Sequence, residues 1–212
     1  MKKIAILTPC YDGSVSIEYS SSLVKSATLL SDNGYSLDHL YVNGEAIVQS
    51  ARNKLFFNAY HNNYDCVVWI DSDIEWDPKD LLKIVSSPLD IIGATYRRKT
   101  MKEMYVAKIS NLVNGDIIEV DGIGFGFLKM SKKIIDALWN TNISYEDDKS
   151  LCKNVFEVIV DKGQMYSEDY VACKKIKDLG FNVYLDKTID LSHSSKINLT
   201  GSFLNWEKQY LT

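Results

Sequence analysis

Asp71 and Asp73 directly follow an apolar run over residues 66–70. A run of that length is typical of a buried strand in an α/β sheet, and ligands bind such sheets at the carboxyl ends of the strands. Two carboxylates one residue apart repel each other unless a cation lies between them. Mg²⁺ or Mn²⁺ suits oxygen ligands and often bridges carboxylates to substrate phosphates. The stretch predicts a metal–diphosphate site, with a capped turn of solvated acids as the alternative.

Two sets of cations could neutralise such a diphosphate. Arg52 lies on the predicted helix just before that strand, and its fixed fork of donors suits phosphate. Arg97, Arg98 and Lys99 follow a predicted strand over residues 91–94, which should end at the same sheet edge. An ordinary surface arginine and a solvated charge run are the respective alternatives.

Glu168, Asp169 and His193 are further candidates. The two acids fall in the first turn of a predicted helix, where negative charge is favoured for structural reasons alone. One of them could also serve as a general base or contact an acceptor hydroxyl. His193 could complete a metal shell of carboxylate and phosphate oxygens, or it could be a satisfied surface histidine.

Gly124, Phe125 and Gly126 lie in a glycine-rich stretch over residues 122–127. The stretch lacks the strand, spacing and helix of a dinucleotide fingerprint. Its glycines predict a close approach of the backbone to a sugar. A bend in a core strand, permitted by glycine, is the alternative.

The elements that must position these residues alternate between strand and helix. This order predicts a parallel, nucleotide-binding half followed by a different second half. Strands are expected at 3–8, 37–42, 66–70 and 91–94, with helices at 16–32 and 45–62 and a short helix that Asp77 caps and Pro78 begins. In the second half we expect a hairpin of 104–109 with 117–121, a strand entered at 122–130, a helix at 131–140, a loop at 141–154, a helix at 167–179 and a strand at 183–185.

Bulk composition limits the class of protein. The 212 residues predict one domain, 1–212, which could be part of a longer polypeptide. A net charge of −4 argues against broad binding to nucleic acid or anionic membrane. The four cysteines form no CxxC pair, which argues against zinc and suits a reducing compartment. No segment approaches the roughly 18–20 apolar residues of a membrane span, so we expect a cytoplasmic protein.

Taken in order, these motifs resemble a GT-A glycosyltransferase over nearly the whole chain. Each motif is weak alone, but seven in this order are fairly specific: 8–9, 51–53, 69–73, 93–99, 124–127, 167–169 and 191–193. The resemblance implies an α/β, GT-A-like fold. Such a fold has a Rossmann-like half with a mixed central sheet and a smaller acceptor-side β/α half.

The resemblance also implies roles for individual residues. The end of the first strand would hold the nucleotide base, at Thr8, Pro9 and Tyr11. Asp71 would face the ribose and metal, whereas Asp73 and His193 would bind Mn²⁺ or Mg²⁺. Arg52 and the cations at 97–99 would lie near the nucleotide or its phosphates, and Glu168 and Asp169 near the acceptor. Asp169 is the first candidate for a base and Glu168 the second, while Gly124–Phe125–Gly126 would lie on the acceptor side.

The expected activity is transfer of a hexose from a UDP-sugar to a glycan or glycoprotein acceptor. The chain also resembles chlorella-virus glycosyltransferase domains that build capsid glycans. That resemblance implies an enzyme in the host cytoplasm, with UDP-glucose or UDP-rhamnose as donor. It favours retention, but the residues leave inversion open: an inverting enzyme needs a carboxylate base, and a retaining enzyme could use the same acids only to orient substrates. A sugar-phosphate nucleotidyltransferase is an alternative, although the loop at 9–14 lacks the basic residue expected there. A non-catalytic carbohydrate-binding domain is another, but it leaves the acids after the buried strand unexplained.

Overall fold

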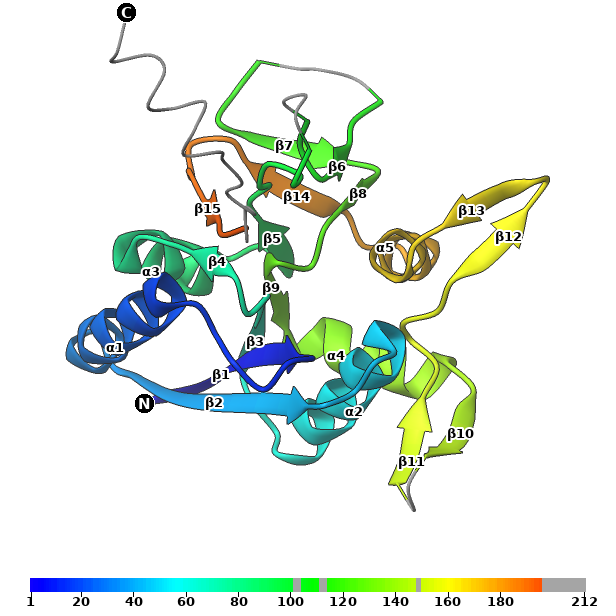
Figure 1. Ribbon diagram of the computed structural model, residues 1–212, viewed down its shortest axis with the longest axis horizontal. Coiled ribbons are helices and arrows are strands. Elements are labelled where there is room, and N and C mark those ends of the chain that lie inside the picture. Colours follow the sequence, from blue (N-terminus) through cyan, green and yellow to red (C-terminus); the bar gives the residue numbers. More distant parts are fainter. Residues whose placement is uncertain (101–103, 111–113, 148–149, 196–212) are drawn as a thin grey trace, which may run out of the picture.

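A seven-stranded mixed sheet forms the centre of the computed structural model, which describes residues 1–100, 104–110, 114–147 and 150–195. The strand order is β2-β1-β3-β9-β5-β14-β7 (Figure 1). These strands are β1 (Lys2–Cys10), β2 (Tyr35–Asn43), β3 (Cys66–Ile70), β5 (Ile91–Gly93), β7 (Ile117–Val120), β9 (Phe127–Ser131) and β14 (Val183–Asp186). Short pairs add β4 (Ile74–Glu75) with β15 (Ser192–His193), β6 (Ala107–Lys108) with β8 (Gly122–Ile123), β10 (Ser144–Asp147) with β11 (Ser150–Lys153), and β12 (Ile159–Asp161) with β13 (Gln164–Tyr166).

The direction of the strands brings several loops to one edge. β1, β2 and β3 are parallel, whereas β9 is antiparallel to both of its neighbours, β3 and β5. β3 and β5 therefore run the same way, and their carboxyl ends lie at the same edge of the sheet. The predicted parallel half is confirmed, with one antiparallel strand inserted into it from the second half of the chain.

Helices cover both faces of the sheet. α1 (Ile17–Asp32) and α3 (Pro78–Ser86) lie on one face, and α2 (Val48–His61), α4 (Lys132–Thr141) and α5 (Glu168–Asp178) on the other. The position of β3 between two cores explains why all of its residues are apolar. Val67 and Trp69 pack into the core below α2, α4 and α5, while Val68 and Ile70 pack into the core below α1 and α3. A strand buried on both faces requires this continuous apolar run.

The helix ends follow the expected local chemistry. The carboxylate of Asp77 accepts a hydrogen bond from the Lys79 amide at 2.8 Å, and Pro78 occupies the first position of α3. Gly180 follows α5 with a φ of +86°, a left-handed conformation that glycine adopts without strain. The predictions of a cap at Asp77 and of a helix beginning near Ser167 are confirmed.

Two predictions for the second half are wrong. Residues 104–109 and 117–121 do not pair with each other, because β6 pairs with β8 and β7 pairs with β14. Joining the main sheet buries Ile118 and Val120, which an isolated hairpin could not do. The stretch 141–154 is not a loop, since it contains the antiparallel pair β10 and β11.

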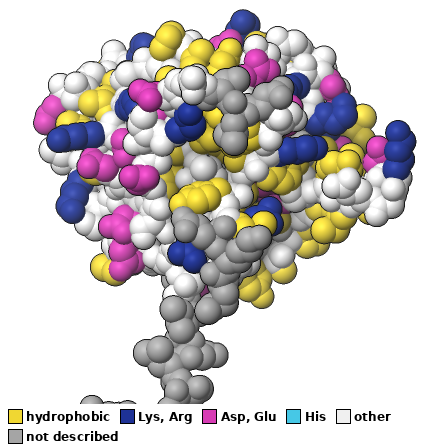
Figure 2. All heavy atoms as spheres, turned by 90° about the horizontal axis from the view of Figure 1, so that it is seen from above, with side chains coloured by type: hydrophobic (Ala, Val, Ile, Leu, Met, Phe, Trp, Pro, Cys, Tyr) yellow, Lys and Arg dark blue, Asp and Glu magenta, His cyan; other side chains and the backbone are white. Residues whose placement is uncertain are grey.

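The surface carries both signs of charge. Lys and Arg side chains are interspersed with Asp and Glu over the face seen in Figure 2. Among the residues that the structure describes, no helix combines the length and apolar character that crossing a membrane requires.

Candidate active site

A cavity of about 360 Å³ lies at the edge where β1 and β3 end. Its walls come from segments far apart in the sequence: the end of β1, the start of α2, the residues after β3 and β5, the first turn of α5, and β15. The lining residues are Pro9, Cys10, Tyr11, Glu45, Ala46, Val48, Ala51, Arg52, Asp71, Ser72, Asp73, Tyr96, Glu168, Asp169 and His193. Most of the residues singled out in the sequence therefore meet at one hollow.

Arg52 links the two sides of this cavity. Its Nη2 lies 3.0 Å from Oδ1 of Asp71, and its Nε lies 3.4 Å from Oε1 of Glu168. The side chain is only 4% exposed, and its guanidinium carbon lies within 6 Å of three ring centres, those of Trp69, Phe125 and Phe156. Burial alone would lower the pKa of the guanidinium, but the charges of Asp71 and Glu168 outweigh it and raise that pKa. Arg52 is a buried, permanently charged bridge between β3 and α5.

Both carboxylate oxygens of Asp71 are engaged by the protein. Oδ1 accepts from Arg52, and Oδ2 accepts from the Tyr96 hydroxyl at 3.3 Å. Burial beside Asp71 raises the pKa of Tyr96 well above its ordinary value, so the hydroxyl keeps its proton. Tyr96 was missing from the predicted site residues. Its position directly before the cation run was the only sequence signal for it.

Asp73 is held by two side chains that can carry a positive charge, those of Lys99 and His193. Oδ2 forms an ion pair with Nζ of Lys99, and Oδ1 lies 3.4 Å from Nε2 of His193. Burial alone would raise the pKa of Asp73, but hydrogen bonds from His193 and Lys99 outweigh it and lower that pKa. Asp73 is therefore an ionised carboxylate facing the cavity.

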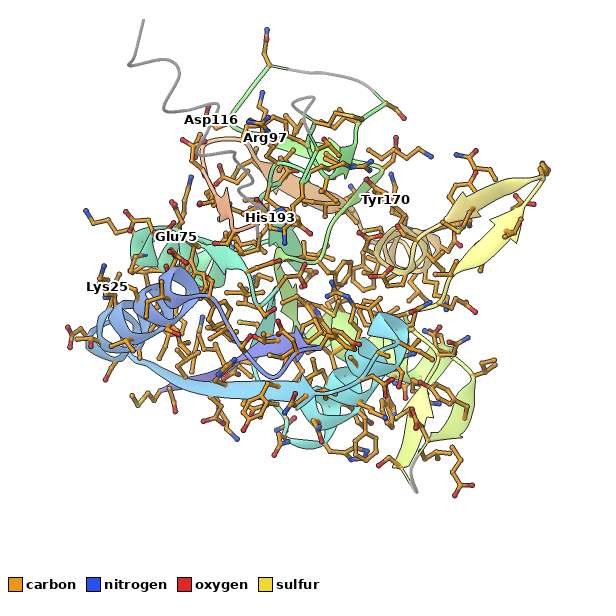
Figure 3. The ribbon with its side chains drawn as sticks, viewed as in Figure 1. Lys25, Glu75, Arg97, Asp116, Tyr170 and His193 are labelled. Atoms are coloured by element: carbon orange, nitrogen blue, oxygen red, sulfur yellow. The ribbon has the colours of Figure 1, made fainter. Side chains whose placement is uncertain are left out.

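His193 is oriented by its backbone and by its other ring nitrogen. β15 pairs with β4, which places His193 opposite Ile74, and the Ser194 amide donates to the Asp73 carbonyl at 2.8 Å. Nδ1 lies 2.8 Å from the Arg97 carbonyl and must donate to it, because a carbonyl only accepts. In Figure 3, Arg97 lies above His193.

The contact between His193 and Asp73 is favourable only with a proton or a cation between the two side chains. In neutral His193, Nε2 carries a lone pair that faces an oxygen of Asp73. Two acceptors at 3.4 Å require a proton or a metal cation between them. Burial lowers the pKa of His193, but Asp73 raises it more, so the pKa lies above its ordinary value. A divalent cation could replace that proton, with carboxylate and imidazole as ligands suited to Mn²⁺.

Asp71, the third predicted metal ligand, does not join Asp73 and His193. Within residues 1–100, 104–110, 114–147 and 150–195, no three His, Cys, Asp or Glu side chains are close enough together to hold an ion by themselves. Asp71 is turned towards Arg52 and Tyr96. An ion at Asp73 and His193 would take its remaining ligands from a bound phosphate and water, as Mg²⁺ commonly does.

Glu168 and Asp169 begin α5 but have different surroundings. Glu168 is 13% exposed and pairs with Arg52; burial raises its pKa in spite of that partner. Oδ1 of Asp169 accepts from the Ser167 hydroxyl and, at 2.8 Å, from the Tyr170 amide. Oδ2 of Asp169 accepts no hydrogen bond from the described residues. Asp169 therefore presents an oxygen to the cavity, whereas Glu168 is committed to Arg52.

The structure places two of the three predicted base-binding residues at the cavity. Pro9 and Tyr11 line the cavity, and the Tyr11 side chain is 69% exposed. Thr8 does not reach the cavity, because it is fully buried and its hydroxyl lies 2.6 Å from that of Tyr19 and 3.1 Å from Nε2 of His39. Thr8 thus supports the strand end rather than facing a ligand.

The cation run after β5 is also divided. Arg97 contributes its carbonyl to His193. Burial raises the pKa of Tyr170 on α5 in spite of the nearby Arg98 side chain. Lys99 forms an ion pair with an acid of the site, Asp73. The three cations surround the rim, and none of them lines the cavity itself.

Gly124, Phe125 and Gly126 lie beneath the cavity instead of on an acceptor surface. Phe125 is fully buried against Trp69 and Phe156. A Cβ atom at either glycine would lie under 3 Å from the Tyr96 hydroxyl. In the structure these glycines allow close approach of the Tyr96 side chain, whose hydroxyl donates to Asp71; the predicted approach to a sugar stays a prediction.

The close contact between Gly126 and the Tyr96 ring can be tested by substitution. We expect Gly126→Ala to lower the free energy of unfolding by about 1–3 kcal/mol, because its Cβ would lie 2.5 Å from Cε1 of a buried ring that cannot move freely. Chemical denaturation measures this change. An unchanged midpoint would show that Tyr96 is not held against the backbone at this position.

Comparisons with known proteins rest on shape, because no protein-family model matches the sequence. No curated protein matches it either. A197 from STIV aligns with a TM-score of 0.60 and 15% identity over 92% of this chain and 87% of that one. A mutant of the Drosophila β-1,4-galactosyltransferase 7, in complex with manganese, UDP-Gal and xylobiose, aligns with a TM-score of 0.55 and 16% identity over 98% and 79%. The inositol-1-phosphate CTP transferase from T. maritima aligns with a TM-score of 0.51 and 13% identity over 93% and 92%. The chain has a GT-A-like glycosyltransferase fold, as the order of its motifs predicted.

Proposed function

We propose that this protein is a metal-dependent glycosyltransferase that moves a hexose from a UDP-sugar to a glycan acceptor. The observation that carries the proposal is the charge balance of the cavity. Five carboxylates line it against one arginine, and Lys54 and Lys99 each neutralise one acid at the rim. The lining residues and these two partners therefore carry two negative charges in excess, and Arg97 and Arg98 do not line the cavity. A diphosphate would be repelled from such a site unless a divalent cation entered with it.

The donor side consists of Asp73, His193 and the residues that hold them. When bound there, Mn²⁺ or Mg²⁺ would act as a Lewis acid on the diphosphate leaving group. Arg97 keeps His193 in the tautomer whose Nε2 faces the ion. Arg52 and Tyr96 hold Asp71 still, so that it faces the donor with a fixed orientation.

The acceptor side consists of Asp169 at the start of α5. In transfer, the bond between the anomeric carbon and the diphosphate oxygen breaks, and the acceptor oxygen bonds to that carbon. The acceptor hydroxyl must lose its proton, and the open oxygen of Asp169 is placed to receive it. Glu168 is a poorer candidate, because a proton taken by Glu168 would break its ion pair with Arg52.

The nucleotidyltransferase alternative shares this fold, as the CTP transferase demonstrates. The two activities differ in the product that is released. A glycosyltransferase releases a nucleoside diphosphate, whereas a nucleotidyltransferase releases pyrophosphate from a nucleoside triphosphate. Residues 9–14 at the cavity mouth contain no Lys or Arg to bind a triphosphate, which favours glycosyl transfer.

A thermal-shift experiment tests the proposal directly. We expect UDP to raise the melting temperature by several degrees in the presence of Mn²⁺ or Mg²⁺, and to have no effect with EDTA, because the ion links the nucleotide to Asp73. Asp73→Ala should abolish the shift. Glu75→Ala is the matched control, since Glu75 lies two residues on and lines a different hollow, and it should leave the shift intact. Equal stabilisation by UDP with EDTA would contradict the metal–diphosphate site.

The finer features stay predictions. They are UDP-glucose or UDP-rhamnose as donor, a glycoprotein acceptor, and a role in the glycosylation of viral capsids. A base at Asp169 serves inversion, whereas in a retaining enzyme Asp169 would only orient the acceptor. The same thermal-shift assay, repeated with a panel of nucleotide sugars, ranks the donors by base and by sugar.

A further inference from the structure

Lys99 occupies the cation position of Asp73. Its Nζ pairs with Oδ2, while Oδ1 of the same carboxylate faces His193. The Lys99 side chain is 41% exposed and Asp73 33%, so the pair lies at the rim, open to ions from solution. One of the two groups proposed to bind metal is therefore already neutralised by a cation that belongs to the chain.

The backbone that carries Lys99 is anchored independently of this ion pair. The Arg98 amide donates to the Met104 carbonyl at 2.7 Å, and the backbones of Arg97 and Tyr105 form an isolated antiparallel β-bridge. The Arg97 carbonyl also holds Nδ1 of His193. The ammonium group of Lys99 can thus leave Asp73 by rotation of its own flexible side chain, without disturbing the contact that orients His193.

We propose that Lys99 is a tethered cation that competes with the divalent metal for Asp73 and moves to the donor's diphosphate when the metal binds. This inference rests on the proposed function. Two cations beside one carboxylate repel each other strongly at 3–4 Å. The metal must displace the ammonium, and the diphosphate then gives that ammonium a new anionic partner. Binding of metal and binding of nucleotide become coupled, each favouring the other.

The variant Lys99→Met separates the two halves of this mechanism, because it removes the charge and keeps the length of the side chain. In the absence of nucleotide, Mn²⁺ should bind Lys99→Met about fivefold more tightly than the wild type, as expected for loss of a competing ion pair at the surface. With Mn²⁺ saturating, UDP should bind the variant at least about fivefold more weakly. A residue with only a structural role would not move the two affinities in opposite directions.

The measurements are electron paramagnetic resonance of free Mn²⁺ and calorimetric titration of UDP, both on the full chain. Lys25→Met is the control, since it changes the net charge equally and lies on α1 at the other hollow, away from His193 (Figure 3). It should leave both affinities unchanged.

The outcomes distinguish this inference from the function on which it depends. Mn²⁺ binding to Lys99→Met but not to the wild type would support competition in its strongest form. If Asp73→Ala loses Mn²⁺ while Lys99→Met binds it no more tightly than the wild type, Lys99 does not compete and only the inference falls. If Asp73→Ala and the wild type both bind Mn²⁺ with the same measurable affinity, or if neither they nor Lys99→Met bind it, the metal site and the inference both fall.

Discussion

Replacing Asp169 by Asn is expected to lower kcat for sugar transfer by about 10²–10⁴-fold, the range typical of a lost general base. Binding of UDP with Mn²⁺ should be unchanged, because Asp169 lies on α5 and contacts none of the groups around Asp73. The substitution keeps the size of the side chain and an oxygen for the bonds from Ser167 and Tyr170. It removes the negative charge and with it the ability to take a proton.

The matched variant is Glu168→Gln, one residue earlier on the same helix. We expect a smaller loss of kcat, because Glu168 acts through its ion pair with Arg52. A release assay for UDP gives kcat, and titration of UDP gives the affinity. Turnover of Asp169→Asn equal to that of the wild type would remove Asp169 from the reaction.

Replacing Arg52 by Met is expected to cost about 3–5 kcal/mol of unfolding free energy, the usual loss when one partner of a buried ion pair is removed. Glu168, whose side chain is 13% exposed, would lose the cation paired with it. Met retains most of the apolar volume against Trp69, Phe125 and Phe156, so the loss reports on the charge. Denaturation in urea measures it.

Two further variants test that explanation of the loss. Lys54→Met lies two residues along α2 and breaks ion pairs with Glu45 and Asp147 at the rim, which should cost no more than about 1 kcal/mol. Adding Glu168→Gln to Arg52→Met should restore part of the stability, because it removes the unpaired charge. Equal losses for Arg52→Met and Lys54→Met would show that Arg52 is not a buried bridge.

Local chemistry in the sequence was sufficient to predict much of the fold and part of the site. The apolar run at 66–70 is long and uninterrupted because β3 is buried on both faces, and its acids follow where the strand ends. The cap at Asp77 depends on residues adjacent in the chain. Both signals depend on residues adjacent in the chain, so they can be recognised without knowing the tertiary contacts.

Tertiary structure alone decided which residues of the candidate site touch one another. The pairing of β6 with β8, the insertion of β9 between β3 and β5, and the pairing of β15 with β4 join segments distant along the chain. The sequence by itself therefore determined that Arg52, Asp71, Asp73, Glu168 and His193 are candidates, and that strand ends carry them. It did not determine that Arg52 pairs with both Asp71 and Glu168, or that Lys99 pairs with Asp73. Those assignments depend on distances across the sheet edge, and residue types and spacing do not encode such distances.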